Sequence, residues 1–208
     1  MKSRFILLLL TLLPLFVHAA EPVAGTDYVE IPGGKPYAPL DGKVEVVEVF
    51  GYTCIHCAHF QPVLGAWLKK QPSSVRFTPL PAAFGGYWMP YARAYYAAAR
   101  LRLLGKTHEA MFKALHETGS LPIQNASDEE IAAFYANYGA DPKAFVAAMQ
   151  SPATALLLDR SRDFAVAAGI EGTPTIVVNG KYRVTARSFD DTLRVTDYLV
   201  ARERAARK

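Results

Sequence analysis

Both cysteines of the chain lie in one short segment. Cys54 and Cys57 form a Cys-x-x-Cys pair, a spacing typical of redox-active dithiols. An apolar, β-branched run over 44–50 precedes the pair, and 58–70 has a helical pattern. A strand followed by a helix places Cys54 at a helix N-terminus, where free N–H groups and the helix dipole favour a thiolate. We therefore expect the Cys54 sulfur to be both the attacking nucleophile and the leaving group in disulfide exchange. Cys57, one turn further in, is expected to be the buried resolving partner.

Other interpretations of the pair fit the sequence less well. His56 and His59 could complete a zinc site, but His56 would point away from the ligand face of a helix, and structural zinc usually takes ligand pairs from separate segments. Covalent haem attachment requires histidine directly after the second cysteine, where this chain has Ala58. A purely structural disulfide across so short a loop would add little stability. We expect neither a metal nor a cofactor.

The first nineteen residues have the pattern of a secretory signal peptide. Lys2 and Arg4 precede an apolar run over 5–17, and cleavage is expected after Ala19. The run is too short to span a membrane. Removing both cations lowers the formal net charge from +4 to +2, which argues against nucleic-acid binding. Export to an oxidising compartment would let a Cys-x-x-Cys pair persist as a disulfide.

The remaining chain has the length and composition of one ordinary domain, with 51% hydrophobic and 20% charged residues in 208. A short edge strand is expected at 28–31 and a strand at 75–78, ended by Pro79. Helical patterns cover 90–104, 107–117, 127–138, 141–150 and 153–168. Ser127 with Glu130 forms a capping box, and glycines at 105, 139 and 169 are expected just past helix ends. His108 and His116 are expected on the surface.

Strand patterns return after the helices. Residues 172–178 and 181–184 are apolar or alternating, and Asn179-Gly180 between them predicts a hairpin with a type I′ turn. A final helix is expected from 190 or 191 to 201. Strands on both sides of a long helical block indicate a mixed α/β fold.

These features together resemble the DsbA family of periplasmic thiol:disulfide oxidants. The matching features are the signal peptide, Glu48 six residues before Cys54, the Cys-x-His-Cys motif, the helical block, and Thr173-Pro174 before the Asn-Gly-Lys-Tyr hairpin. The resemblance covers most of the mature chain. It implies an α/β thioredoxin fold with an inserted all-helical subdomain: signal peptide 1–19, first thioredoxin half 20–83, helical insertion 84–168, and second thioredoxin half 169–208.

The resemblance also implies roles for further residues. Thr173-Pro174 would have a cis peptide bond set against the cysteines, and Thr173 would offer its backbone to an extended substrate peptide. His56 would help to stabilise the thiolate. Glu48 would be a buried carboxyl near Cys57 that relays its proton. We therefore expect Cys54, Cys57, His56, Pro174 and Glu48 to be catalytic.

The chain departs from the best-known family members at two positions. Ile55 replaces the usual proline between the cysteines, which leaves the strength of the oxidant open. The lysine that accompanies the buried glutamate in some members would fall at Pro79, which cannot donate a proton. Thr173, Ile55 and Phe84 are expected to bind substrate, although Phe84 could equally pack in the core.

The resemblance predicts a monomeric periplasmic oxidant that passes its disulfide to reduced exported proteins and is reoxidised by a DsbB-type, quinone-coupled membrane oxidase. Two alternatives remain. A disulfide reductase or isomerase would use the same fold, although isomerases of that compartment usually carry a dimerisation domain, for which residues 20–43 are too short. A chaperone-like peptide-binding protein would use the cysteines only incidentally.

Overall fold

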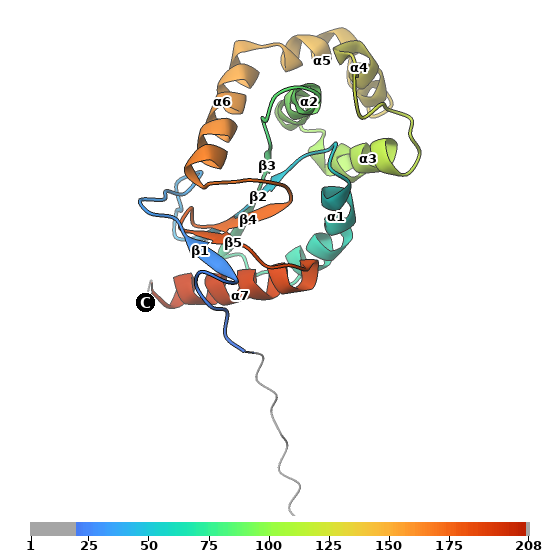
Figure 1. The fold of residues 1–208 in the computed structure, drawn as a ribbon. Coiled ribbons are helices and arrows are strands. Elements are labelled where there is room, and N and C mark those ends of the chain that lie inside the picture. Colours follow the sequence, from blue (N-terminus) through green and yellow to red (C-terminus); the bar gives the residue numbers. More distant parts are fainter. Residues whose placement is uncertain (1–19, 207–208) are drawn as a thin grey trace, which may run out of the picture.

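Strand β2 (Val44–Phe50) lies at the centre of the fold. The computed structural model describes residues 20–206, so the signal peptide expected over 1–19 lies outside the described residues (Figure 1). Five strands form one sheet in the order β1-β5-β4-β2-β3. Strand β2 is parallel to β3 and antiparallel to β4. The other strands are β1 (Tyr28–Glu30), β3 (Val75–Pro81), β4 (Thr175–Val178) and β5 (Tyr182–Val184).

Both faces of the sheet are covered by helices, which explains the nearly continuous apolar sequence of β2. Val44 and Val46 pack in a cluster with α1 (Ile55–Leu68) and α7 (Phe189–Ala205). Val47 and Val49 point to the opposite face and pack with α6 (Pro152–Ala167). In Figure 1, α7 crosses one face of the sheet, and α6 lies on the other side. This three-layer arrangement is the thioredoxin fold that the sequence predicted.

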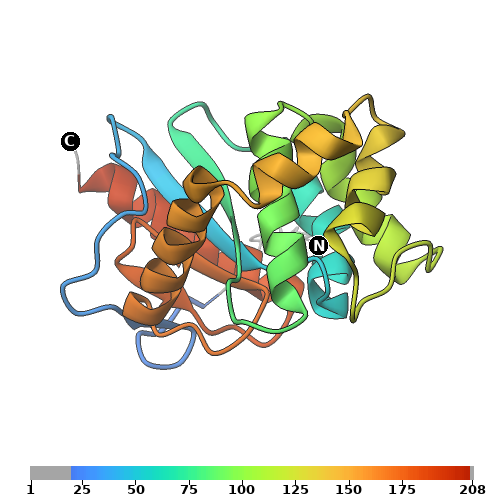
Figure 2. The same cartoon turned by 90° about the horizontal axis from the view of Figure 1, so that it is seen from above.

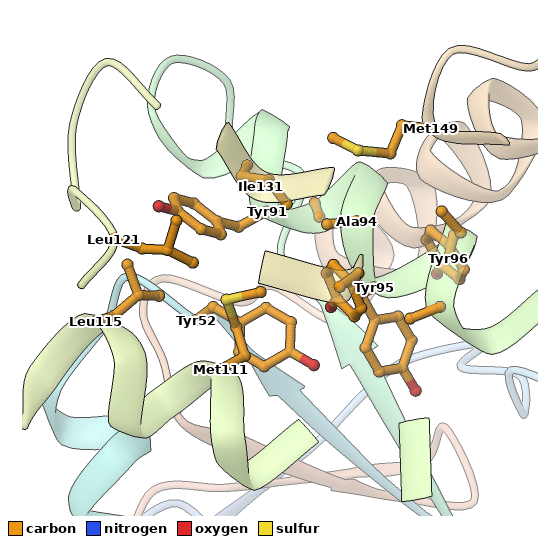
Figure 3. Close-up of a cluster of buried hydrophobic side chains, with 14 of the residues drawn as sticks. Tyr52, Tyr91, Ala94, Tyr95, Tyr96, Met111, Leu115, Leu121, Ile131 and Met149 are labelled. Atoms are coloured by element: carbon orange, nitrogen blue, oxygen red, sulfur yellow. The ribbon is translucent and has the colours of Figure 1, made fainter. Parts of the chain in front are cut away.

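The inserted helices form a block beside the sheet, seen from above in Figure 2. Its core also contains Phe50, Tyr52 and Cys57 from the end of β2 and the start of α1. Figure 3 shows Tyr52 among side chains of the inserted helices. The cysteine pair therefore lies where the block meets the sheet. The block contains α2 (Trp88–Arg100), α3 (Leu104–His116), α4 (Asp128–Ala136) and α5 (Pro142–Met149).

Strand β3 runs past the residue at which the sequence predicted its end. It continues through Pro79 to Pro81. The N–H of Ala82 donates to the carbonyl of Phe50 (2.7 Å), so alternate N–H groups face β2 and the two prolines occupy the outward positions. Because β3 is an edge strand, the missing N–H groups break no sheet hydrogen bond.

One helix boundary in the inserted block was also predicted wrongly. Helix α2 ends at Arg100, and Gly105, expected to follow its end, lies in the first turn of α3. Arg102 instead takes the left-handed conformation, with φ 59°. The link between the two helices therefore uses a non-glycine residue with positive φ. A helix end of this kind is missed when helix ends are predicted from the positions of glycines.

The other turn and cap signals are confirmed. Ser127 and Glu130 form both hydrogen bonds of the capping box. Asn179 and Gly180 have φ values of 51° and 65°, and Lys181 N–H donates to Val178 O across the turn (2.9 Å), as a type I′ hairpin requires. Within 20–206, no helix combines the length and apolar character needed to cross a membrane.

Candidate active site

Cys54 is the N-cap residue of α1, as the sequence predicted. Its backbone is extended (φ −91°, ψ 115°), and its Sγ accepts a hydrogen bond from the N–H of Cys57 (3.4 Å). Both cysteines are free thiols. Cys54 is partly exposed, whereas Cys57 is completely buried. A substrate sulfur can therefore reach Cys54 and not Cys57.

The two thiols have opposite acidities. Hydrogen bonding that involves the Cys57 and Thr173 side chains and the backbone N–H groups of Cys57 and His56 lowers the pKa of Cys54 from 9.0 to about 5. Burial raises the pKa of Cys57 far above its ordinary value. The Cys57 Sγ accepts a long hydrogen bond from the Gly51 N–H (3.5 Å). Near neutral pH, the reduced pair is thus a thiolate at Cys54 and a thiol at Cys57.

His56 acts on this pair differently from the sequence expectation. Its backbone N–H belongs to the first turn of α1 and helps to lower the pKa of Cys54. Its side chain is exposed, and across residues 20–206 the ring is in none of the hydrogen bonds found. The imidazole therefore has only its charge with which to influence the thiolate in this arrangement.

Thr173-Pro174 lies against the reactive sulfur. The peptide bond between them is cis, as the sequence predicted, and the Thr173 carbonyl oxygen lies 3.4 Å from Cys54 Sγ, where it accepts a hydrogen bond when the thiol is protonated. A cavity of about 240 Å³ opens beside this contact, between the start of α1 and the start of α7. It is lined by residues that include His56, Phe60, Thr173, Pro174 and Phe189.

Glu48 is a buried carboxyl behind the cysteines. Gln61 donates to its Oε1 (3.2 Å), and its Oε2 has no partner within the described part of the chain. Burial raises the pKa of Glu48 to about 8. Its register partner on β3 is Pro79, so the position where some relatives carry a lysine offers no charge. Glu48 is therefore protonated near neutral pH.

Ile55 and Phe84 are both more than two-fifths exposed, at 42% and 43%. Ile55 borders a cavity of about 280 Å³ between α1 and α3, opposite the Thr173 side. The Phe84 ring lies 5.6 Å from that of Trp88. Since Phe84 is exposed, the core-packing alternative is wrong, and its side chain is accessible near the reactive loop.

Two histidines of α3 were wrongly expected on the surface. His108 and His116 are half-buried. The Tyr52 hydroxyl lies 2.8 Å from His108 Nδ1, and His116 Nε2 lies 2.7 Å from the Tyr52 carbonyl oxygen. The sequence carries a weak signal for this contact, because Phe112 stands midway between them and residues four apart share a helix face.

Within residues 20–206, no group of three or more His, Cys, Asp or Glu side chains is placed to hold a metal ion. The site therefore consists of thiols, one buried acid, and backbone groups. Such a set can form, exchange and break S–S bonds.

Comparison with known proteins agrees with this chemistry. A family model described as "Thioredoxin" matches residues 34–197. The "Thiol:disulfide interchange protein DsbA" of Azotobacter vinelandii is 39% identical over 190 residues, which are 90% of this chain and 87% of the relative. This chain belongs to the DsbA family.

Two further DsbA proteins extend the comparison. DsbA of Pseudomonas aeruginosa is 36% identical over the full length of both chains. The crystal structure of the oxidoreductase DsbA from Xylella fastidiosa superposes with a TM-score of 0.88 at 56% identity, and it covers 89% of this chain and all of that one. The chain is therefore a thiol:disulfide oxidoreductase of thioredoxin fold with a helical insertion.

Proposed function

We propose that this DsbA-family chain donates a Cys54–Cys57 disulfide to reduced exported proteins in the periplasm. The observation that carries the proposal is the division of acidity in the dithiol: the pKa of Cys54 is lowered to about 5, while burial raises that of Cys57. A stable Cys54 thiolate favours the reduced form of the protein. A protein with a favoured dithiol is a strong donor of its disulfide.

The reaction has two exchange steps. A substrate thiolate attacks Cys54 Sγ of the oxidised protein, the Cys54–Cys57 bond breaks, and its electron pair leaves on Cys57. A second substrate thiolate then attacks the substrate sulfur of the mixed disulfide, and Cys54 leaves as a thiolate. The substrate gains one disulfide, and the protein becomes a dithiol by accepting two electrons.

Glu48 has a role in the first step. A Cys57 thiolate released in a buried site is unstable, because its pKa is raised by burial. Glu48 is protonated near neutral pH, and it lies close enough to Cys57 that its ionised form would raise the pKa of Cys57. In our proposal, Glu48 gives its proton to the departing Cys57 sulfur, and takes one back when the protein is reoxidised.

The substrate is held beside Cys54 by Thr173 and Pro174. The Thr173 carbonyl oxygen lies 3.4 Å from Cys54 Sγ, so an extended peptide that pairs with this backbone as an added strand is held against the reactive sulfur. The exposed side chains of Ile55 and Phe84 contribute apolar contact. These contacts select unfolded, extended substrates.

A DsbB-type, quinone-coupled membrane oxidase completes the cycle in this proposal. It removes two electrons from the dithiol and restores the disulfide. The proposal treats the protein as a monomer, which size-exclusion chromatography with light scattering can check.

Replacing single cysteines tests the function. Reduced Cys57→Ser, added to an excess of a disulfide-linked dimer of a one-cysteine peptide, should accumulate a mixed disulfide at Cys54, because the Cys54 thiolate displaces one peptide thiol and the variant has no second thiol to resolve the product; Cys54→Ser should form none. Oxidised wild-type protein should convert a reduced two-cysteine peptide into its disulfide, and Cys54→Ser should transfer nothing. Mass spectrometry of quenched mixtures measures both species, and the oxidised wild-type protein is the positive control. The assignment fails if Cys54→Ser, and not Cys57→Ser, is the variant that traps the peptide.

A further inference from the structure

Helix α3 contacts the loop that leads into the active site. The loop between β2 and α1 makes a tight turn in which the Cys54 N–H donates to the Gly51 carbonyl (3.1 Å). Tyr52, inside this turn, meets α3 with both its side chain and its backbone. Its hydroxyl is 2.8 Å from His108 Nδ1, and its carbonyl oxygen is 2.7 Å from His116 Nε2.

The contact extends along one side of α3. His108, Phe112 and His116 are four residues apart and so share a helix face. The Tyr52 ring centroid lies 5.0 Å from that of Phe112 and 5.3 Å from that of His108. Tyr52 is only 2% exposed. The three side chains therefore hold Tyr52 in a dry, well-packed site, where a hydrogen bond is strong.

Two hydrogen bonds join Tyr52 to α3. Burial raises the pKa of Tyr52 well above its ordinary value, so its hydroxyl keeps its proton, and the His108 tautomer sets which of the two groups donates. Burial also lowers the pKa of His108 to about 4, so its ring is neutral and Nδ1 can accept. A carbonyl oxygen can only accept, so His116 Nε2 donates to Tyr52.

We propose that His116 is a positioning residue for Cys54, acting through its hydrogen bond to the Tyr52 carbonyl. This carbonyl belongs to the peptide unit that joins Tyr52 to Thr53, and Cys54 follows immediately. Fixing the peptide unit sets where α1 begins and where the Cys54 sulfur lies relative to the Cys57 N–H, which it meets at 3.4 Å. The inference deepens the proposed function and rests on it.

A loose loop would change the chemistry of Cys54. Hydrogen bonds to a helix N-terminus weaken steeply with distance and angle. Without the His116 contact, the Tyr52–Thr53 peptide unit can rotate, and the sulfur leaves the N–H groups that stabilise its thiolate. The inserted helical block would thus tune the redox pair as well as enclose it.

His116→Ala and His116→Gln test the proposal as a pair. Alanine removes the donor, so the thiolate absorbance titration of reduced protein should move up by about one pH unit, and the equilibrium constant for oxidation of glutathione should fall about tenfold. The glutamine amide can still donate an N–H to the carbonyl, so His116→Gln should restore most of both values. If the alanine variant does not fold, His116→Met fills similar space without a donor.

His59→Ala is the matched control. His59 is close to Cys54 in sequence, but its side chain is exposed, so its removal should leave the Cys54 titration unchanged. If His116→Ala and His116→Met lower the melting temperature and leave that titration at the wild-type value, His116 supports the fold alone and the proposal is wrong. Failure of the wild-type protein to oxidise a peptide would overturn the proposed function without changing this result.

Discussion

At the scale of single residues, different surroundings give two chemically identical thiols different acidities. Cys54 meets donors at the start of a helix, and Cys57, three residues later, is enclosed by the core of the inserted block. A thiolate is favoured by N–H donors and disfavoured by apolar burial. Two positions one helical turn apart therefore have opposite acidities, and this difference sets the direction of the exchange reaction.

His56→Ala tests how the exposed ring acts. Because the ring forms no hydrogen bond within the described residues, it can stabilise the thiolate only through its charge. We expect the Cys54 pKa to rise in the variant at low ionic strength, and the difference from wild type to shrink at about 1 M salt, where the Debye length is about 3 Å. Thiolate absorbance titrations at both salt concentrations measure it. A difference that persists unchanged in high salt would indicate a direct hydrogen bond instead.

Glu48→Gln tests the buried acid through stability. Glu48 has a pKa of about 8 when folded and 4.5 ordinarily, so the unfolded chain releases this proton first. Its contribution to stability is greatest below pH 4.5 and is lost as pH rises towards 8. At pH 7 the loss is roughly 3 kcal/mol. Glutamine cannot ionise, so the variant should equal wild type at pH 4 and exceed it by up to that amount at pH 7.

Urea unfolding of both reduced proteins at the two pH values gives the comparison. The charge of the Cys54 thiolate also raises the pKa of Glu48, so its contribution cancels only in part; repeating the comparison with both oxidised proteins, which have no thiolate, removes it. Equal stabilities at pH 7 would show that Glu48 is ionised in the folded protein, and would remove it as a proton donor to Cys57. Slower formation of the mixed disulfide by the oxidised variant would agree with the relay.

At the scale of elements, the loops and helix ends of the inserted block position the reactive loop. Gly51 has no side chain, and a Cβ there would lie 2.0 Å from the Trp88 ring of α2. The same loop meets α3 on its other side through Tyr52. The loop is therefore enclosed between two inserted helices, and their stability bears on the geometry of the cysteines.

Ser127→Ala should destabilise the inserted block without changing the thiols. The Ser127 hydroxyl accepts from the Glu130 N–H (3.1 Å), and the Glu130 carboxylate accepts from the Ser127 N–H (2.8 Å). Losing an N-cap of this kind costs about 1 kcal/mol. Chemical denaturation should report that loss, and Ser127→Asp, which keeps an acceptor, should recover most of it. The Cys54 titration is expected to stay at the wild-type value in both variants.

At the scale of the whole molecule, the redox state is coupled to stability. Only the dithiol form contains the Cys54 thiolate, whose pKa is lowered from 9.0 to about 5. Its stabilising effect is complete above pH 9 and is lost as pH falls through 5. Because Cys54 is partly exposed, water reduces the two-unit effect at pH 7 to about 1–2 kcal/mol.

Melting the reduced and oxidised proteins at two pH values measures this coupling. Relative to the oxidised form, the reduced form should lose about 1–2 kcal/mol between pH 7 and pH 4. At pH 7 we expect the reduced form to have the higher melting temperature, because a protein that donates its disulfide is more stable as a dithiol. A stability difference independent of pH would mean that the thiolate is not stabilised, and a higher-melting oxidised form at pH 7 would favour the reductase alternative.

The sequence by itself determined the fold class, the reactive pair and the cis proline segment. The reactive pair and the hairpin depend on local signals, Cys-x-x-Cys between a strand and a helix and an Asn-Gly turn, which restrict the backbone where they occur. The cis bond at Thr173-Pro174 followed from the resemblance to the DsbA family. The prediction that Cys54 caps α1 needed only the strand, the turn and the helix. Glu48 could be identified from the sequence because an acidic side chain in an apolar strand is expected to be buried, and burying a carboxyl group is costly unless it finds a partner or stays protonated.

Only the tertiary structure decided what lies across from these residues. The contact of His108 and His116 with Tyr52 joins positions more than fifty residues apart, and the partner of Glu48 proved to be Gln61 rather than a group on β3. The outer position of β3, which lets Pro79 sit in a strand, is a property of the sheet order. Such partners are set by long-range packing, and the residue pattern of a single segment does not show which distant part of the chain will pack against it.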